Sequence, residues 1–594
     1  MDSAAADVVA AAPRARLAQI VFRILAVGMG AAHAAAAGLR QSMSEDGISY
    51  LDMGDAYLRG DWTMAINAVW SPLYAWILGL ALWLANPSPR WEFPLVHLVN
   101  FGIYLLALVG FEFFWRRVGE AARVDAEGRE VGFPEWAWVA IGYSLFLWSS
   151  LCLIKIWAAT PDMLVAALVY FAGGLLVRIG ATRARRTVHA AYGLVLGLAY
   201  LAKAVMFPLG FAFLAAGAVV GKDRRRAFRG TALSVGMFLA VSLPLVLALS
   251  VSKQRPTFGD AGRLTYLRYV NGVPYPLWPA GFQSKTGRPE HPARLVFEDP
   301  PVYEFGAPVG GTYPLSYDPS YWYEGLTPRF EPREQARVLL ASAQGYFELF
   351  IRQQGGFLAT VAILLLVGGT LRVRPRFDGR WALTAVALVA FALYGLVYVE
   401  GRYVAPFVVL FWAGILSHLR LPEGEESRKL LRVSGAVLVV FMLVPIAQFE
   451  AEFGSAFLDL ELPEMISTPA TPQPWPARPP LERAGSAPEI AEGLQELGVR
   501  PGDAIGFVGH AFGAYFARLA GVKIVAQLQS PDASRFWDAR GSARLAVLEA
   551  FAEAGAEAVI AERVPPEGPG KGWRRIGRTS HWIYFLTPPP GLPR

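Results

Sequence analysis

Long apolar runs recur along this chain, and they leave few folds open to it. Each run has about 17 to 25 residues, enough for a helix to cross the ~30 Å hydrocarbon layer of a membrane. Hydrophobic residues make up 54% of the 594 residues and charged residues only 17%, a balance that a water-soluble core would not require. The sequence therefore predicts an all-α polytopic membrane domain with about 11 to 13 transmembrane helices. The eleven clearest runs lie near 17–37, 93–114, 134–154, 162–178, 188–202, 204–220, 231–251, 355–371, 381–398, 403–418 and 431–448.

The formal charge of +7 is compatible with nucleic-acid binding, so the distribution of the basic residues has to decide what it means. Lys and Arg gather in short segments between the apolar runs, which is the pattern of cytoplasmic loops, and this argues against nucleic-acid binding. The one cysteine, Cys152, lies inside an apolar run, so the sequence offers no disulfide framework and no cysteine-based metal site. The first run follows Arg14 and Arg16 and lacks a small-residue cleavage pattern, so we expect it to be retained as a span.

The segment "WSPLYAWILGLALWLANP", 70–87, decides the topology. It is apolar but short, and it begins with a Ser-Pro break. If it does not cross the membrane, the cytoplasmic loops are all rich in Lys and Arg, as the positive-inside rule requires. We therefore expect 70–87 to be an interfacial or re-entrant helix. The cytoplasmic loops are then "WRRVGEAAR", "RIGATRARR", "GKDRRRAFR", "RVRPRFDGR" and "HLRLPEGEESRKLLR".

This topology divides the chain into three parts. A membrane domain, 1–450, carries two long exported loops at 38–92 and 252–352. Residues 451–484 come next, and their Pro-rich composition predicts a linker. Residues 485–594 are expected to form a small extracytoplasmic α/β domain, because "DAIGFVG", "VKIVAQL" and "EAVIAE" are typical of short strands, with helical patterns between them near 511–520 and 541–555.

The stretch "SMSEDGISYLDMGDAYLRGDW", 42–62, gathers acidic residues on the exported side. A helix over 48–62 would place an apolar face on the membrane surface. Asp55 falls within that face, so it either faces a polar cavity or is exposed by fraying at Gly54. We expect Asp52 and Asp61 to be solvated charges on the helix surface. The apolar face consists of Ile48, Leu51, Leu58 and Trp62.

Glu45 and Asp46 precede this helix at the mouth of the membrane, and two interpretations stay open for them. Carboxylates stabilise a helix N-terminus, so they could act as caps. Alternatively, one of them could serve as a general base or a metal ligand for an acceptor hydroxyl near the lipid head groups.

The same stretch resembles the first external loop of the membrane GT-C glycosyltransferases that use polyprenyl-phosphate sugars. These include the protein O-mannosyltransferase-like, aminoarabinose-transferase-like and lipopolysaccharide-core-transferase families. The family pattern has an acidic pair, a Tyr four residues after its first Asp, and Gly-Asp-Trp further on. Asp46, Tyr50 and Gly60-Asp61-Trp62 fill these places. Gly47 departs from the pattern at the second acidic position.

Three other segments resemble motifs of the same family. "ATPDMLVAALVY" implies Asp162 as an active-site carboxylate, "GLVLGLAYLAKAVMFPL" implies Lys203 at an external turn, and "EGRYVAPF" implies Arg402 and Tyr403 in the substrate site. "WSPLY", at 70–74, occupies the place of the Lys-Pro-Pro-Leu element of the aminoarabinose branch. This chain lacks the Lys of that element, so the resemblance does not imply that it transfers the sugar of that branch.

Physical chemistry gives each of these residues a functional and a structural interpretation. Lys203 and Arg402 could bind a lipid phosphate, since a cation within the membrane needs such a partner, but Lys203 could also extend toward the head groups. Asp162 could act in catalysis or stabilise the start of a helix after Pro161. The seven histidines are scattered, so we predict no histidine-built metal site. The cofactor is left open, with a divalent cation as one option.

Two further segments carry weaker signals. The aromatic residues of loop 252–352 suit either sugar binding or anchoring at the membrane interface. "GFVGHAFG", 506–513, has the composition of a phosphate-binding turn, but such glycine-rich turns between a strand and a helix are usually structural, and we favour that interpretation.

The resemblance implies an inverting glycosyltransferase in the inner or plasma membrane, with its active site and C-terminal domain facing the extracytoplasmic side. Its partners would be a polyprenyl-phosphate sugar donor and a lipid, glycan or protein acceptor. Asp46 would be the catalytic base, assisted by Asp162. Tyr50, Lys203, Arg402 and Tyr403 would bind substrate. The alternative is a transporter or flippase for a lipid-linked glycan, which would favour internal repeats and broken helices near the bilayer midplane. A scaffold without catalytic activity is a third option.

Overall fold

The structure is a computed structural model. It describes residues 2–40, 43–122, 132–181, 184–221, 224–277, 282–368, 378–421, 424–458, 486–562, 564–566 and 568–587. Most of the expected linker, 459–484, lies outside the described residues.

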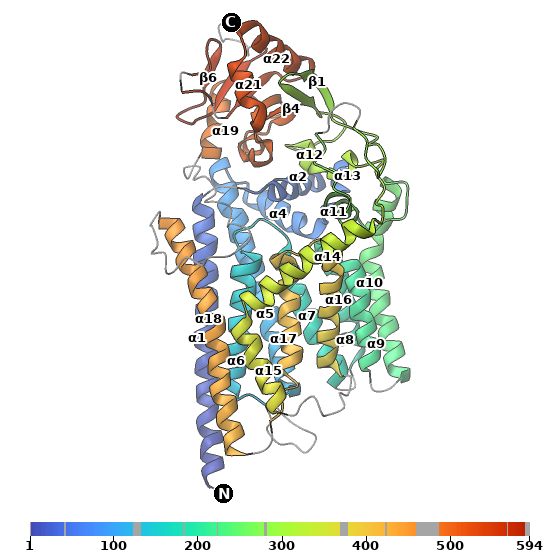
Figure 1. The fold of residues 1–594 in the computed structure, drawn as a ribbon, viewed down its shortest axis with the longest axis vertical. Coiled ribbons are helices and arrows are strands. Elements are labelled where there is room, and N and C mark those ends of the chain that lie inside the picture. The colour runs from blue at the N-terminus through green and yellow to red at the C-terminus, as the bar shows by residue number, and fades with distance from the viewer. Residues whose placement is uncertain are drawn as a thin grey trace.

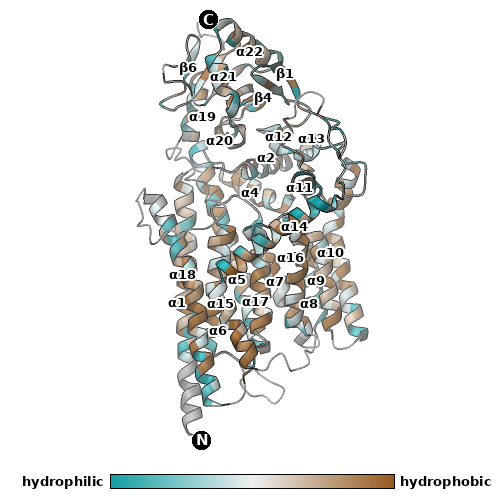
Figure 2. Cartoon of the chain, viewed as in Figure 1, coloured by the Kyte–Doolittle hydropathy of each residue, from teal (hydrophilic) through white to brown (hydrophobic). Residues whose placement is uncertain are grey.

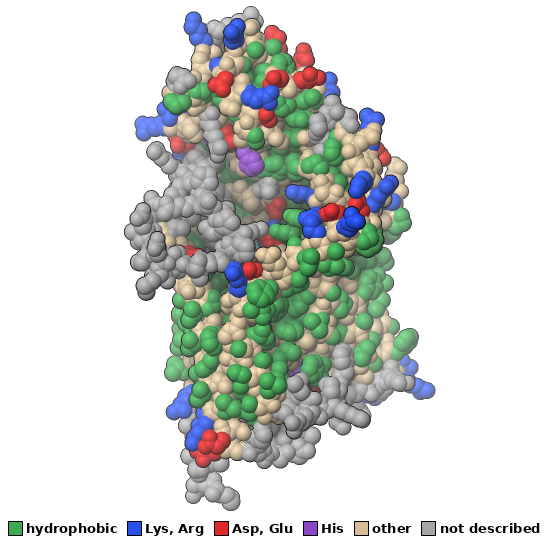
Figure 3. All heavy atoms as spheres, in the orientation of Figure 1, with side chains coloured by type: hydrophobic (Ala, Val, Ile, Leu, Met, Phe, Trp, Pro, Cys, Tyr) green, Lys and Arg blue, Asp and Glu red, His purple; other side chains and the backbone are tan. Residues whose placement is uncertain are grey.

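A bundle of long helices forms the lower part of the molecule (Figure 1). Hydrophobic residues predominate along these helices (Figure 2), and apolar side chains cover the visible face of the bundle, with charged side chains at its two ends (Figure 3). Each predicted apolar run coincides with one of its helices. These are α1 (Asp2–Arg40), α5 (Pro89–Ala122), α6 (Glu135–Leu147) with the π-helix η1 (Trp148–Ile154), α7 (Asp162–Ala181), α8 (Arg186–Ala202), α9 (Met206–Val220), α10 (Arg224–Ser252), α15 (Gly355–Val367), α16 (Gly379–Gly395), α17 (Gly401–Leu416) and α18 (Glu425–Leu458).

Length and composition separate these helices into two groups. Within the described residues, six helices are long and apolar enough to cross a membrane. A seventh span results if the pair Pro332–Arg352 and Gly355–Val367, bent by 76°, is counted as one. Four further apolar helices have only 10–17 residues. The expected count of 11 to 13 is therefore reached only if shorter helices of the bundle cross as well.

Three helices built from the first external loop lie between the bundle and the C-terminal part of the chain (Figure 1). They are α2 (Glu45–Arg59), α3 (Trp62–Ala65) and α4 (Pro72–Ala85). The 14 residues of α4 give a length of about 21 Å, too short to cross the hydrocarbon layer. Helices α2 and α4 pack backbone to backbone, because a Cβ on Gly54 would lie 2.8 Å from the carbonyl oxygen of Ala75 and 3.0 Å from the Cα of Gly79.

The second of the two loops predicted to be external, 252–352, is called the second external loop below, and its described residues form a layer of helices and strands. They are α11 (Ala261–Tyr269), β1 (Arg294–Glu298), β2 (Pro301–Glu304), α12 (Pro314–Tyr317), α13 (Pro319–Trp322), α14 (Pro332–Phe347) and the π-helix η2 (Glu348–Arg352). Many of the aromatic residues are buried, among them Tyr313, Tyr317, Trp322 and Tyr323. Burial of these rings inside the layer gives them a packing role.

The C-terminal residues form the expected α/β arrangement. Strands β3 (Ala504–Gly509), β4 (Lys523–Gln529) and β5 (Ala558–Ala561) are parallel neighbours, with β4 and β5 on either side of β3. They correspond to the three predicted strands. Strands β6 (Trp573–Arg575) and β7 (Trp582–Phe585) extend the sheet beyond β5 in antiparallel fashion. The helices are α19 (Ser486–Glu496), α20 (Tyr515–Ala520), α21 (Ala533–Asp538) and α22 (Gly541–Glu553).

This sheet also includes two strands from the second external loop. Its seven strands have the order β1-β2-β4-β3-β5-β7-β6. Strand β2 pairs with β4 in antiparallel register, Tyr303 opposite Gln527 and Glu304 opposite Ala526. The sequence analysis assigned loop 252–352 to the membrane domain and the tail to a separate domain. The sheet contains strands from both of these parts of the chain. The domain boundaries therefore stay a prediction.

Candidate active site

The N-terminal end of α2 brings Asp46 over the helix bundle. Ser44 caps the helix, and its hydroxyl accepts a hydrogen bond of 3.3 Å from the amide of Gly47. Asp46 therefore lies in the first turn, where the helix dipole stabilises a negative charge. A Cβ on Gly47 would lie 2.9 Å from the Cβ of Ala159. The glycine that departs from the family pattern thus allows α2 to contact the turn that precedes α7.

Asp162, the first residue of α7, is almost fully buried, with a relative exposure of 3%. Lys203 lies in the turn between α8 and α9 and donates a hydrogen bond of 2.5 Å from Nζ to Asp162 Oδ1. This ion pair joins the start of one helix to the end of another. Charge-assisted hydrogen bonds of this kind are strong when buried.

Arg402, in the first turn of α17, stands between the two candidate catalytic carboxylates. Its Nη1 lies 3.8 Å from Oδ2 of Asp46 and 3.7 Å from Oδ2 of Asp162. Its Nε lies 2.9 Å from Oε1 of Glu400. The two Nη1 contacts exceed hydrogen-bond distance, so this nitrogen holds the two carboxylates by charge alone.

Two tyrosines border the charged cluster. The ring of Tyr403 lies 3.6 Å from Lys203 Nζ, within cation–π range, and its hydroxyl accepts a 3.2 Å hydrogen bond from Arg402 Nη2. Tyr50 is buried on α2 and packs edge-on against Tyr74, with 5.1 Å between ring centroids. Burial, together with the negative charges of Asp46 and Asp162, raises the pKa of Tyr50 well above its ordinary value. Tyr50 therefore stays neutral and can act as a hydrogen-bond donor.

The surroundings of Asp46 shift its protonation. Burial raises the pKa of this carboxyl, the charge of Arg402 opposes the rise, and the charge of Asp162 adds to it. The side chain still has a relative exposure of 28%, so its carboxylate borders open space. A carboxyl with a raised pKa that a substrate can reach is suited to accept a proton from a hydroxyl.

The structure thus brings together all six residues singled out as site residues. They come from four places in the sequence: α2, the start of α7, the turn after α8, and the start of α17. The cluster consists of Asp46, Tyr50, Asp162, Lys203, Arg402 and Tyr403.

Glu400 was not singled out from the sequence, although it contacts Arg402. The signal was present in "EGRY", where the carboxylate lies two residues before the arginine. With Glu400, the cluster contains three carboxylates and two cations, so its formal charge is −1. The guanidinium of Arg402 lies where a cation bridging Asp46 and Asp162 would lie.

One group of side chains elsewhere could hold a metal by geometry. Glu290, His291 and Glu324 bring ligand atoms within 4.8 Å of one another. Glu324 already lies 2.8 Å from Lys253 Nζ and 3.1 Å from His291 Nε2. These contacts satisfy the carboxylate without an ion, so the group is explained as an ion-pair cluster.

The structure shows the surroundings of the other acidic residues of the stretch 42–62. The prediction for Asp52 was wrong, and the one for Asp55 had left two interpretations open. Asp52 was expected to be solvated, and this was wrong: it is 9% exposed and lies 2.8 Å from Arg518 of the C-terminal domain. The partner is 466 residues away in the sequence, which local periodicity cannot reveal. Asp55 lines a cavity, as one of its two interpretations required. Asp61 is the helix cap of α3 and is solvated.

At the glycine-rich turn 506–513, a carboxylate from another segment occupies the place where a phosphate would bind. The amide of His510 donates a 2.7 Å hydrogen bond to Glu562 Oε1, and a Cβ on Gly509 would clash with the Glu562 side chain. A negative charge at this amide opposes phosphate binding, in agreement with the structural interpretation.

Comparison with known proteins gives structural similarity alone. No protein-family model and no curated protein matches the chain. Its fold is similar to that of ArnT. The crystal structure of ArnT from Cupriavidus metallidurans in the apo state has a TM-score of 0.49 and 13% identity, covering 95% of this chain and 97% of that one. The same protein bound to undecaprenyl phosphate gives a TM-score of 0.48, 13% identity, and coverage of 94% and 97%.

A third similar structure is the Archaeoglobus fulgidus oligosaccharyltransferase in complex with Zn and sulfate. It has a TM-score of 0.41 and 10% identity, covering 90% of this chain and 68% of that one. Identities of 10% to 13% show similarity of fold alone.

Proposed function

We propose that this protein is a membrane glycosyltransferase of the GT-C type, which transfers a sugar from a polyprenyl-phosphate donor to an acceptor hydroxyl on the exported face. The observation that carries the proposal is the bridging position of Arg402 between Asp46 and Asp162, beside Lys203. Two carboxylates and two cations at one end of apolar helices match the needs of a reaction on a lipid phosphate at the membrane surface.

In this proposal, Lys203 and Arg402 bind the donor phosphate. Arg402 Nη1 has no close hydrogen-bond acceptor among the described side chains that contact it, so its protons can be donated to a phosphate oxygen. Lys203 offers a second positive charge, held in place by Asp162 and the ring of Tyr403. Both cations would stabilise the negative charge that develops on the leaving phosphate.

Asp46 takes the proton from the acceptor hydroxyl. The hydroxyl oxygen then attacks the anomeric carbon and forms the new glycosidic bond, while the bond between that carbon and the phosphate oxygen breaks. The electron pair of the broken bond leaves with the polyprenyl phosphate. Attack opposite to the leaving group inverts the anomeric configuration.

The position of the site favours transfer over transport. A transporter would place its polar residues near the middle of the membrane, between helices that are broken there. Here the charged residues lie at the starts of α7 and α17 and just after the end of α8. All of these face the layer formed by α2 and the external loops, at one end of the bundle (Figure 1).

The proposal is tested by replacing Asp46 with Asn in the full-length protein, purified in lipid. Sugar transfer from polyprenyl-phosphate donors is measured against Asp61→Asn as the control. We expect Asp46→Asn to lower the rate by about 10²- to 10⁴-fold, the usual contribution of a general base. Asp61→Asn should retain activity, because Asn caps a helix as well as Asp does. Full activity of Asp46→Asn would exclude the assigned role.

A further inference from the structure

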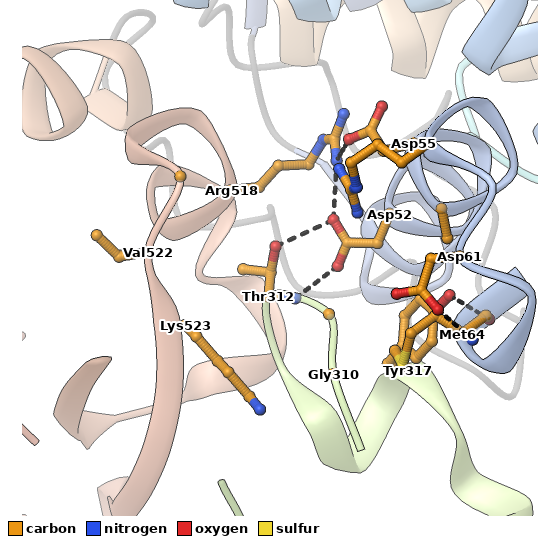
Figure 4. Close-up of a pocket in the computed structure, with 14 residues that line it drawn as sticks. Asp52, Asp55, Asp61, Met64, Gly310, Thr312, Tyr317, Arg518, Val522 and Lys523 are labelled. Carbon is orange, nitrogen blue, oxygen red and sulfur yellow. Dashed lines mark hydrogen bonds and ion pairs between the residues drawn. The ribbon is translucent and has the colours of Figure 1, made fainter. Parts of the chain in front are cut away.

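Helix α2 presents two functional faces. At about 100° per residue, Asp46 and Tyr50 lie on one face, and Asp52 and Asp55 lie on the opposite one. The first pair contributes to the candidate active site. The second pair faces the C-terminal domain and forms part of the lining of a cavity of about 300 Å³ (Figure 4). A displacement of the second face would therefore also displace Asp46, because both belong to the same helix.

Arg518, on α20, contacts both carboxylates of this second face. Its Nη1 lies 2.8 Å from Asp52 and 2.8 Å from Asp55, and its Nε donates a 2.9 Å hydrogen bond to Glu92 in the first turn of α5. Figure 4 shows the guanidinium reaching from the C-terminal domain toward α2. One side chain thus connects the C-terminal domain to α2 and to a helix of the bundle.

Because these side chains are buried, water cannot easily replace the ion pairs between them. The side chains of Arg518, Asp52 and Glu92 are 7%, 9% and 16% exposed. Without the guanidinium, three carboxylates would face one another at low dielectric, and their repulsion would separate the elements that carry them. The contact depends on the planar fork of arginine, which a lysine cannot reproduce.

The second external loop joins the same point. Thr312 donates to Asp52 twice, from its amide at 2.6 Å and from its hydroxyl at 3.1 Å. Tyr515, three residues before Arg518, donates a 3.0 Å hydrogen bond to Glu92. Four separate segments of the chain therefore meet at the contact made by Arg518.

We propose that Arg518 is a positioning residue that holds α2 so that Asp46 stays against Arg402 and Asp162. The proposal rests on the function proposed above, because it assigns Asp46 to catalysis. Arg518 is not one of the six residues of the candidate active site. It acts through α2, whose first turn is also seated on Ala159 through Gly47.

The test compares Arg518→Gln and Arg518→Lys with the control Arg535→Gln in the full-length protein. Arg535 lies in the same domain, is 51% exposed, and pairs with Asp532 and Asp299 at the surface. The readouts are kcat and donor KM for sugar transfer, and hydrogen exchange of the α2 amides. Exchange reports local opening, whether or not a substrate is present.

We expect Arg518→Gln to lower kcat by up to about 100-fold, the effect of misplacing a catalytic group by about 1 Å. Donor KM should stay within about twofold, because Lys203 and Arg402 do not belong to α2. Exchange should increase in α2 while strands β3 and β4 stay protected. Arg518→Lys should give an intermediate loss, and Arg535→Gln should match the wild type.

A purely structural role would lower the yield of folded protein and leave kcat and α2 exchange unchanged; that result would overturn the proposal. If Arg518→Gln does not fold, Asp55→Asn removes only one of the three carboxylate contacts and should change kcat and exchange in the same direction. A wild-type protein without transferase activity would refute the proposed function, whereas unchanged exchange in these variants would refute the positioning role alone.

Discussion

The protonation of Asp46 gives the proposed reaction a characteristic pH dependence. A general base works in its deprotonated form, so activity is present above its pKa and is lost as the pH falls through that value. Burial raises the pKa of Asp46, so we expect the acidic limb of kcat/KM against pH to lie above the ordinary range of Asp, about pH 4. The charged groups that face Asp46 are Arg402, Glu400, Asp162 and Lys203.

The measurement is a pH–rate profile at donor concentrations well below KM. Asp61→Asn serves as the control, because Asp61 is not among the charged groups that face Asp46 and its protonation should not affect the limb. An acidic limb at the ordinary value for an aspartate would contradict the assignment of a buried base.

The packing of α2 on the turn before α7 explains why glycine occupies position 47. We expect Gly47→Val to displace the first turn of α2 from Ala159, because even a Cβ at this position comes within 2.9 Å. The cost of such overpacking is about 1 to 3 kcal/mol, and the displacement should lower transfer strongly by moving Asp46. Gly102→Ala in α5 is the matched control, since its Cβ would meet no atom within 4 Å.

Thermal unfolding and transfer assays on both variants check this prediction. Gly102→Ala should change neither quantity appreciably. Wild-type activity in Gly47→Val would show that the approach of α2 to the turn does not set the position of Asp46.

Most elements could be predicted from the sequence because each has a local cause. The long apolar runs predicted the bundle helices, and short apolar segments predicted β3, β4 and β5. The segment 70–87 was ambiguous by its Ser-Pro break and short length, and the positive-inside rule predicted that it does not cross. Even the acidic helix was predicted, although it begins and ends three residues earlier, at Glu45–Arg59.

Contacts between distant segments could not be predicted in the same way. Asp52 looks solvated by periodicity alone, since nothing near it in the sequence indicates Arg518. Strands β1 and β2 lie in a loop whose aromatic residues suggested either sugar binding or anchoring at the membrane interface, and their partner β4 follows only after the last bundle helix. Lys203 and Arg402 were found because their motifs could be recognised, whereas Glu400 had no motif of its own.

The direction in which the whole molecule crosses the membrane can be measured directly. The chain has a single cysteine, so a Cys152→Ser background allows one new cysteine to be labelled at a time. Lys285, in the second external loop, is 81% exposed, and Arg226 lies in the first turn of α10, at the opposite end of the bundle. We expect an impermeant maleimide to label Lys285→Cys in intact cells and Arg226→Cys only after permeabilisation. The reverse pattern would place the candidate active site in the cytoplasm.

The pairing of β2 with β4 means that the tail is not a detachable module. A fragment that begins after the last span would leave one side of β4 without its partner, and its free N–H and C=O groups would be open to other chains. The tail therefore depends on a hairpin made much earlier in synthesis, which must already be on the same side of the membrane when the tail emerges. Exchange of tails between related proteins would succeed only if residues 294–304 were transferred with them.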